Sequence, residues 1–222
     1  MKPPSYPQQY YSFQKYVTKH RMLTFWYQLQ EVLAVQPSSV LEIGIGPGVV
    51  SAYLRYLGVK VTTVDINPSL QTDHVGSVLD LQSIFKSQQF DLVLCARVLH
   101  HLPYNEFERA LEQLAYVSKE HVLLTLPFNE GRLYLMTRYT SSPLRTFSLP
   151  LPLQFKQMVL RLKGVKPPTE SSLWKIDDSK NTSLTQVRGK VSEVFDIIED
   201  YRIPEDSAHY LMVLQKKKQH QK

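Results

Sequence analysis

The sequence predicts an α/β fold in which helices are wound on both faces of a mostly parallel sheet. Short apolar runs typical of buried strands alternate with helical patterns through residues 40–126. The first run leads into a glycine-rich turn that opens a helix, and the second ends at an acidic residue. Such alternation implies parallel strands with crossover helices, and ligands of these sheets bind at the carboxyl ends of the strands.

The glycine-rich turn lies in VLEIGIGPGVVS, residues 40–51, where Gly44, Gly46 and Gly48 follow the strand at every second position. Glycine has no Cβ, so its backbone takes positive φ and lets a ligand come close. The start of the next helix adds unpaired N–H groups and a positive dipole end. The turn therefore suits a ligand with an anionic end, although an α/β protein without a cofactor can also carry such a turn.

The spacing of the glycines narrows the choice of ligand. A dinucleotide fingerprint, G-x-G-x-x-G, needs glycine where Val49 stands, which disfavours an NAD-dependent dehydrogenase. The stretch resembles motif I of the class I S-adenosylmethionine-dependent methyltransferases, an acidic residue followed by G-x-G-x-G. The resemblance implies S-adenosylmethionine as cofactor, bound by Glu42, Gly44, Gly46 and Gly48.

A second match follows the β-branched run at residues 61–64, which ends at Asp65, about twenty residues after the first glycine. A carboxylate at this strand end can accept both ribose hydroxyls of the adenosyl group. The resemblance places Ile66 against the adenine face. Alternatively, Asp65 is a turn residue that opens the Asn67-Pro68 loop.

The residue that contacts the adenine amino group has two candidates. We expect a third strand at residues 74–78 and a short helix at 79–85. Many relatives carry an acidic residue directly after the third strand, where Ser77 stands here, while Asp80 comes three residues later. Either residue fits the role, and Asp80 is included among the predicted cofactor-binding residues.

A third match follows FDLVLC, the predicted fourth strand at residues 90–95. Residues 96–103 resemble the VLHHLP-type loop of the family, in which the backbone beyond this strand touches the methionine part of the cofactor. Ala96 and Arg97 are therefore predicted to bind it. His100 and His101 are each either a base for a hydroxyl acceptor or a structural hydrogen-bonding residue, and no catalytic residue is assigned. No N/D-P-P-Y motif follows, which disfavours methylation of bases or glutamines.

The flanking elements follow from periodicity. Residues 1–12 are predicted to form an irregular arm. Residues 15–35 are predicted to form an amphipathic helix, whose apolar stripe consists of Met22, Trp26, Leu29 and Leu33. In the family, a helix before the first strand covers one edge of the cofactor site.

A later helix is predicted to begin at a capping pair, Asn105 with Glu108, and to bury a stripe that starts at Phe107. A fifth strand is predicted at residues 121–126.

Beyond the fifth strand the alternation breaks. Residues 129–191, rich in aromatic residues and proline, predict a substrate cap, in which 153–163 is either a cap helix or a membrane-surface helix. Residues 195–203 and 209–214 predict a hairpin like the antiparallel one that closes the seven-stranded sheet of the family. The predicted organisation is an arm and covering helix (1–37), a methyltransferase-like domain (38–217) and a basic tail (218–222).

Composition excludes several classes of protein. The chain has 222 residues, 43% hydrophobic and 21% charged, as expected for one soluble domain. The single cysteine, Cys95, excludes an internal disulfide and indicates a reducing, cytoplasmic location. No apolar run has the length of a membrane span, and no signal peptide is visible. The formal charge is +6, but most of it comes from four lysines at the end of the chain, Lys216, Lys217, Lys218 and Lys222. Without them the basic count falls from 26 to 22, against 20 acidic residues, so nucleic acid is a disfavoured partner.

The sequence thus predicts an S-adenosylmethionine-dependent methyltransferase that transfers a methyl group by in-line displacement, with no metal site. A small molecule is the favoured acceptor, and RNA and protein are less favoured alternatives. The alternative is a sensor or partner subunit that binds the cofactor without catalysis. The sequence does not indicate the oligomeric state.

Overall fold

The computed structural model describes residues 8–12, 16–129, 131–137, 145–151 and 172–217. The helix predicted at 153–163, as a cap helix or a membrane-surface helix, lies outside these ranges, as do the first residues of the arm and the basic tail. The helices are α1 (Lys19–Val35), α2 (Val49–Tyr56), α3 (Leu81–Ile84), α4 (Phe107–Val117) and α6 (Leu184–Val194). The strands are β1 (Ser39–Ile43), β2 (Lys60–Asp65), β3 (His74–Val75), β4 (Phe90–Ala96), β5 (Ser118–Pro127), β6 (Gly131–Thr137), β7 (Arg145–Leu151), β8 (Phe195–Ile203) and β9 (Asp206–Lys216).

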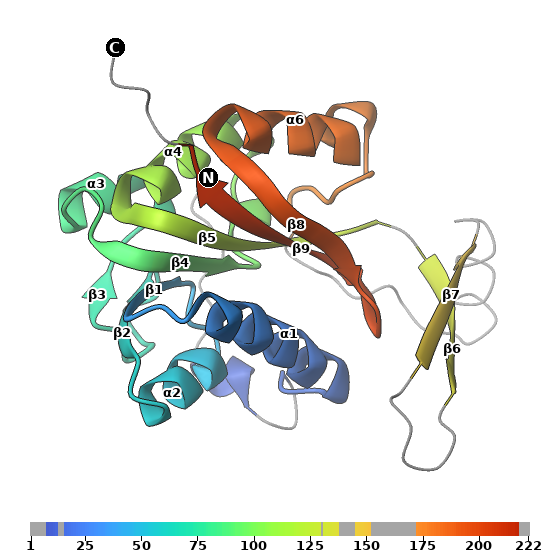
Figure 1. The fold of residues 1–222 in the computed structure, drawn as a ribbon, viewed down its shortest axis with the longest axis horizontal. Coiled ribbons are helices and arrows are strands. Elements are labelled where there is room, and N and C mark those ends of the chain that lie inside the picture. The colour runs from blue at the N-terminus through green and yellow to red at the C-terminus, as the bar shows by residue number, and fades with distance from the viewer. Residues whose placement is uncertain (1–7, 13–15, 130, 138–144, 152–171, 218–222) are drawn as a thin grey trace.

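The main sheet has seven strands in the order β3-β2-β1-β4-β5-β9-β8 (Figure 1). The first five are parallel, and β9 pairs antiparallel with both β5 and β8. The predicted fold class and the closing hairpin are confirmed. Because the chain runs outward from β1 to β3 and then returns to place β4 on the other side of β1, the strand order reverses between β1 and β4. Sheets of this type bind ligands at that switch point.

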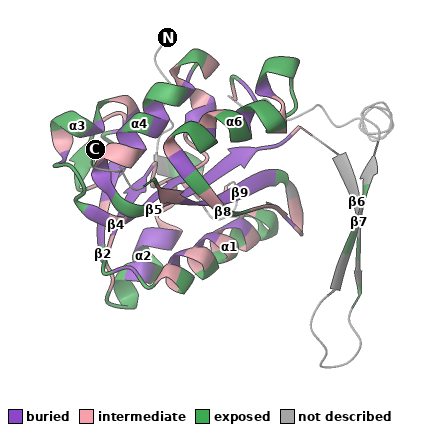
Figure 2. Ribbon diagram, turned by 45° about the horizontal axis from the view of Figure 1, so that its top comes forward, coloured by how far each residue is buried: buried purple, intermediate pink, exposed green. Residues whose placement is uncertain are grey.

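Helices cover both faces of the sheet, with α1 and α2 on one face and α3, α4 and α6 on the other (Figures 1 and 2). Alternate residues of β1 enter different cores, since side chains of a strand point to opposite faces in turn. Val40 packs with Val50 and Leu54 of α2, whereas Leu41 and Ile43 join the core beneath α4. The sheet is therefore buried on both sides along its central strands.

Helix α1 forms where predicted but buries a partly different face. Met22 and Trp26, expected in the apolar stripe, are 43% and 55% exposed. The buried side chains are Thr24, Gln28 and Val32, at a spacing of four residues. The predicted stripe is partly right, because Leu29 and Leu33 pack against the core, but Met22 and Trp26 do not. The first turns of the helix cover the polar carboxyl edge of the sheet, where hydrophobicity does not mark the inner face.

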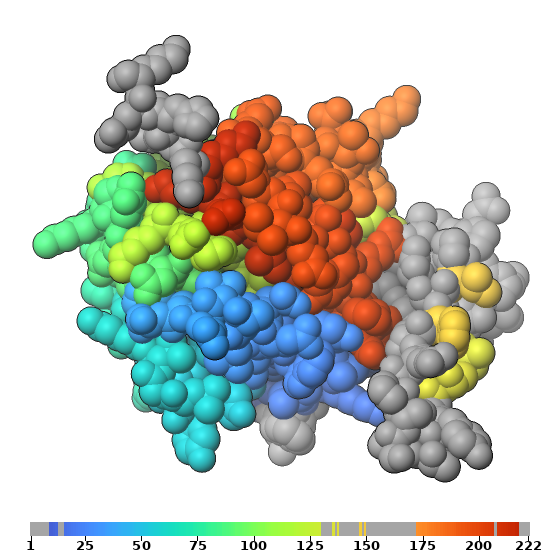
Figure 3. All heavy atoms as spheres, in the orientation of Figure 1, coloured from blue at the N-terminus to red at the C-terminus, as the bar shows by residue number. Residues whose placement is uncertain are grey.

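Helix α1 is held over this edge by the hairpin of β8 and β9. The Tyr27 hydroxyl donates to Glu205 at 2.7 Å, the Tyr201 hydroxyl donates to Glu31 at 2.6 Å, and the Thr24 hydroxyl donates to Asp206 at 3.1 Å. Figure 3 shows the surfaces of helix and hairpin side by side. The last strands thus position a helix from the start of the chain.

Other boundaries depart from prediction in smaller ways. The third strand ends at Val75, and Ser77 instead caps a short 3₁₀ helix, Val78–Asp80. Helix α4 begins after the 3₁₀ turn Tyr104–Glu106 without a side-chain cap, so the capping pair is wrong, although its inner face is buried from Phe107 onward.

The described part of the predicted cap falls into two regions. Strands β6 and β7 form a separate two-stranded sheet that lies to one side of the main body (Figures 1 and 2). By contrast, Trp174 and Ile176 are buried in the main core, and α6 packs through Val187 and Val191 into the same core. Residues 172–191, predicted as cap, therefore lie within the body of the domain.

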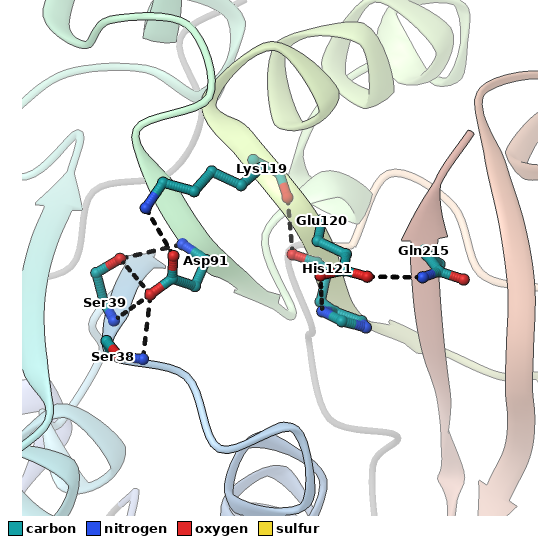
Figure 4. A network of polar contacts seen from close by, with 8 residues as sticks. Ser38, Ser39, Asp91, Lys119, Glu120, His121 and Gln215 are labelled. Carbon is teal, nitrogen blue, oxygen red and sulfur yellow. Dashed lines mark hydrogen bonds and ion pairs between the residues drawn. The ribbon is translucent and has the colours of Figure 1, made fainter. Parts of the chain in front are cut away.

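At the amino edge of the sheet, Asp91 joins the starts of three strands (Figure 4). Its carboxylate accepts hydrogen bonds from the Ser38 and Ser39 amides at 3.1 and 2.8 Å, and from Lys119 at 2.7 Å. These bonds connect β1, β4 and β5 at the end of the sheet opposite the glycine turn.

Two further predictions can be compared with the structure. Cys95 is fully buried, and burial raises the pKa of its thiol above the usual range, as expected for an inert core cysteine. Among the described residues, no helix combines the length and the hydropathy needed to cross a bilayer.

Candidate functional site

A cavity of about 460 Å³ lies at the carboxyl ends of β1, β2 and β4. The glycine turn, the loop after β4 and helix α1 form its walls, so it occupies the switch point of the sheet. Its lining includes seven of the nine predicted site residues: Glu42, Gly44, Gly46, Asp65, Ile66, Ala96 and Arg97.

The glycine turn requires glycine for two separate reasons. Gly44, Gly46 and Gly48 have φ values of +77°, +53° and +71°, in the left-handed region that other residues avoid. A Cβ on Gly44 would also collide with the side chain of Val98. Gly48 is the N-cap of α2 and lies outside the main cavity. The sequence around the turn is therefore fixed by backbone conformation and by close packing with the loop after β4.

Glu42 is a buried carboxylate, 5% exposed, at the end of β1. Burial raises its pKa to about 7, with a smaller contribution from Asp65, and hydrogen bonds from Ser51 and the charge of Arg55 only partly oppose this shift. Its Oε2 has no hydrogen-bond partner among the described residues. An unpartnered carboxylate oxygen beside a cavity can accept a hydrogen bond from a ligand.

Asp65 ends the neighbouring strand β2 and faces the same cavity. Its Oδ1 accepts a hydrogen bond from the Asn67 amide at 2.8 Å. Burial raises the pKa of Asp65, against the lowering effect of amides at Asn67, Ile45 and Ile66. Ile66 lies beside it with a 39% exposed side chain, so a carboxylate and an apolar surface are adjacent at this strand end.

Ser77 lines the cavity, whereas Asp80 does not. The Ser77 hydroxyl accepts a hydrogen bond from the Leu79 amide at 3.1 Å and starts a 3₁₀ turn. This turn carries Asp80 away from the cavity, where its carboxylate lies 3.4 Å from Arg109 and its side chain is 60% exposed. Of the two candidates for the adenine contact, Ser77 therefore lines the cavity, and Asp80 lies outside it.

The loop after β4 brings Ala96, Arg97 and two histidines to the cavity. Arg97 has a φ of +59°, and its amide donates to the Thr125 carbonyl at 2.9 Å. A left-handed arginine is uncommon and suggests a site-specific constraint on this backbone. The loop thus leaves the sheet sharply at the switch point.

His100 is 2% exposed, and its Nδ1 has no hydrogen-bond partner among the described residues. Burial holds the pKa of His100 well below its usual value, and the charges of His101, His209, Lys175 and Arg21 lower it further. The imidazole is therefore neutral at physiological pH. The rings of His100 and His101 are 4.0 Å apart.

Sequence reasoning missed a group of residues from the start of the chain. Arg21, Thr24 and Gln28 of α1 line the cavity, and none of them belongs to the predicted apolar stripe. They recur at i, i+3 and i+7, but a polar stripe at this spacing ordinarily marks the outer face of a helix. No local signal distinguishes the two cases. Three tyrosines complete this wall: Tyr10, Tyr11 and Tyr16.

The charged groups of the cavity are divided between its two sides. Carboxylates come from the ends of β1 and β2, while basic side chains come from the loop after β4 and from α1. Within the described ranges, no group of three or more histidine, cysteine or acidic residues is placed to hold a metal ion.

The sheet order and the position of the cavity define a Rossmann-like α/β domain. Residues 41–126 match the family model described as a methyltransferase domain. This span contains the glycine turn, Asp65 and the loop after β4. The resemblance to the class I S-adenosylmethionine-dependent methyltransferases is thereby confirmed.

Solved structures share the fold at low identity. The protein PH0226 of Pyrococcus horikoshii OT3 has a TM-score of 0.58 at 16% identity, covering 96% of this chain and 100% of its own. Magnesium protoporphyrin IX methyltransferase (ChlM) of Synechocystis PCC 6803, crystallised with bound S-adenosylhomocysteine, has a TM-score of 0.58 at 13% identity, covering 89% and 84%. The small RNA methyltransferase HEN1 has a TM-score of 0.59 at 13% identity, covering 89% of this chain and 25% of HEN1. No curated protein sequence matches this chain.

Proposed function

We propose that this protein is an S-adenosylmethionine-dependent methyltransferase that acts on a small-molecule acceptor. The observation that carries the proposal is the meeting of the glycine turn, Glu42 and Asp65 around one cavity at the switch point of the sheet. The three features belong to separate sequence motifs, and each supplies a different contact that an adenosyl amino acid needs.

The residues of the cavity fit this cofactor. Asp65 would accept hydrogen bonds from the ribose hydroxyls, with Ile66 against the adenine ring. Glu42 offers an unpartnered oxygen for a donor group of the cofactor. The positive φ values of the turn at Gly44 and Gly46 allow the backbone to approach it closely. When bound, S-adenosylmethionine supplies an electrophilic methyl group on a sulfonium sulfur.

The rest of the chain orients the acceptor and excludes water. Helix α1 and the tyrosines of the arm cover the cavity, so a reactant inside it is shielded from bulk solvent. Holding the two reactants in line is the main contribution that a protein makes to such a displacement. A cavity of about 460 Å³ suits a cofactor with a small acceptor better than a macromolecular substrate.

Calorimetric titration with S-adenosylmethionine, S-adenosylhomocysteine and NADH tests the proposal. We expect micromolar binding of the two sulfur ligands and no response to NADH. Binding of NADH alone would revive the dehydrogenase alternative. Release of S-adenosylhomocysteine in the presence of a metabolite extract would then separate an enzyme from a cofactor-binding sensor, which gives no product with any acceptor.

A further inference from the structure

Helices α1 and α2 lie next to each other on one face of the main sheet, and their outer surface is apolar. Five large hydrophobic side chains on it are exposed: Met22 (43%), Trp26 (55%), Tyr53 (46%), Tyr56 (83%) and Leu57, directly after α2 (45%). Figure 3 shows the side chains of the two helices side by side on the same face of the molecule. Monomeric proteins rarely expose an apolar surface that spans two neighbouring helices, and such a surface marks an interaction site.

This α1–α2 surface carries almost no charge. From Met22 to the end of α2, the exposed helical positions are Met22, Trp26, Gln30, Ala34, Ala52, Tyr53, Arg55 and Tyr56. The one charged residue among them, Arg55, forms an ion pair with Asp73 at 2.7 Å. At the border of the surface, the Glu31 carboxylate accepts hydrogen bonds from Tyr201 and Gln30. The charges nearest to the surface are therefore already engaged within the chain.

The helices on the opposite face of the sheet have a different outer surface. Exposed positions of α4 and α6 include Glu108, Arg109, Glu112, Arg188 and Glu193, as expected of helices that face water. The α1–α2 surface instead combines aromatic residues and methionine with a depletion of charge, which is the composition of the buried centre of a protein interface. This contrast indicates that the α1–α2 surface is covered in solution.

We propose that two copies of the chain associate through this surface, with α1 and α2 of one copy packed against those of the other around a twofold axis. A twofold interface brings the same surface of both copies together, so an exposed charge would lie near its own duplicate. The α1–α2 surface avoids this repulsion, because Arg55 is paired and the other exposed positions are uncharged. From their exposed fractions, the five hydrophobic side chains present roughly 600 Å² per copy, close to the ~800 Å² that each partner of a stable complex buries.

A lipid surface fits these residues less well. Helices that lie on bilayers carry lysine and arginine beside their apolar face. The exposed helical positions from Met22 onward hold only Arg55, whose charge is balanced by Asp73. A second copy of the chain needs no such basic residues. In the dimer, α1 would lie between the partner copy and the cavity, which Thr24 and Gln28 line from its inner face.

Sedimentation equilibrium of the full chain tests the proposal. At about 10 μM we expect twice the monomer mass of 25.8 kDa. Trp26→Glu and Tyr56→Glu each bring two like charges into the interface, so each should weaken the dimer at least about tenfold. Ile198→Glu is the matched control, because it replaces a side chain of β8 that is 58% exposed outside the α1–α2 surface, and it should leave the mass unchanged. Circular dichroism establishes that each variant is folded.

A wild-type chain that is still monomeric at about 100 μM would overturn the proposal, as would a dimer that persists in both glutamate variants of the α1–α2 surface. Dissociation of Ile198→Glu alone would also overturn it and would place the contact on the edge strand β8. Cosedimentation of a monomeric wild type with phosphatidylcholine vesicles, lost in Trp26→Glu, would show that lipid covers the surface instead. Because these measurements use no cofactor, their outcome is independent of the proposed function.

Discussion

Two carboxylates at opposite edges of the same sheet have opposite environments. Asp91, at the amino edge, accepts hydrogen bonds from two serine amides and from Lys119, and the Lys119 contact is the main reason that its pKa is lowered. Glu42, at the carboxyl edge, is buried with an oxygen that has no partner among the described residues, and its pKa is raised to about 7. The Asp91 carboxylate therefore stabilises the fold, whereas the buried Glu42 carboxylate lowers its stability.

The difference in hydrogen bonding shows which edge of the sheet has polar groups available for a ligand. Strand β1 is involved at both edges: Ser39 at its start bonds Asp91, and Glu42 lies near its end. Polar groups at the amino edge satisfy one another, so they have little left for a ligand. Around the cavity, four buried polar atoms have no hydrogen-bond partner among the described residues, at a cost that a ligand can offset: Arg21 Nη1, Glu42 Oε2, Arg97 Nε and His100 Nδ1.

The largest expected effect distinguishes glycines near the two edges. Gly44→Ala should lower the free energy of unfolding by about 2 to 5 kcal/mol, because the residue has positive φ and its Cβ collides with Val98. Gly58→Ala, before β2, has a similar φ of +85° but open space around the Cβ, so only about 1 to 2 kcal/mol is expected. Urea unfolding measures both. Equal losses would show that close packing at the turn contributes nothing.

Glu42→Gln should stabilise the ligand-free protein at high pH. A raised pKa means that the folded state keeps a proton that the unfolded state releases, so wild-type stability falls as pH rises from about 4.5 to about 7. The penalty amounts to roughly 3 kcal/mol, and glutamine does not incur it. Urea unfolding at pH 8 should therefore favour the variant by this amount, with no difference near pH 4.5.

Glu112→Gln, on the exposed face of α4, is the matched control. It should leave the free energy of unfolding unchanged both at pH 8 and near pH 4.5. A Glu42→Gln variant that is less stable than wild type at pH 8 would mean that the carboxylate has a stabilising partner.

Asp91→Asn, unlike Glu42→Gln, should destabilise the protein. We expect its free energy of unfolding at pH 7 to fall by about 1 to 2 kcal/mol. Because the folded pKa of Asp91 is lowered, its stabilisation is present above its ordinary pKa and disappears as pH falls through the folded value. The difference from wild type should therefore vanish in acid. Asp196→Asn, at an exposed position of β8, serves as control. A loss that persists at pH 2 would indicate a packing effect instead.

A smaller effect is expected on binding rather than on stability. Asp65→Asn should weaken S-adenosylmethionine binding by roughly 1 to 3 kcal/mol, since it removes a charged acceptor for the ribose hydroxyls. Asp80→Asn should change the affinity less than about twofold, because this carboxylate faces Arg109 outside the cavity. Calorimetry compares the two. Equal losses would show that Asp80 reaches the cofactor despite its position in the structure.

The sequence predicted the parallel part of the sheet well because its signals are local. Buried strands such as residues 90–95 are continuous apolar runs, and the glycine turn depends on backbone conformations that only glycine adopts readily. The motif residues Glu42 and Asp65 line the same cavity because strand ends in this topology converge. Local patterns and tertiary position therefore agree along this part of the chain.

The basic side of the cavity could not be predicted in this way. Hydrophobic periodicity predicted Leu29 and Leu33 of α1 on the inner face, and both pack against the core. It did not predict that Thr24 and Gln28 are also buried, because they are polar residues that line a polar cavity. The contacts that orient α1, such as Tyr27 with Glu205, join residues 178 positions apart. The 3₁₀ turn that carries Asp80 away from the cavity likewise has no strong signal in the sequence.

A crystal structure of the complex with S-adenosylhomocysteine tests the central claim most directly. We predict that the ribose hydroxyls lie within hydrogen-bonding distance of Asp65, with the amino-acid part over Gly44 and Gly46. A ligand whose ribose lies away from Asp65, or whose adenosyl group lies beside His100, would contradict this placement of the cofactor.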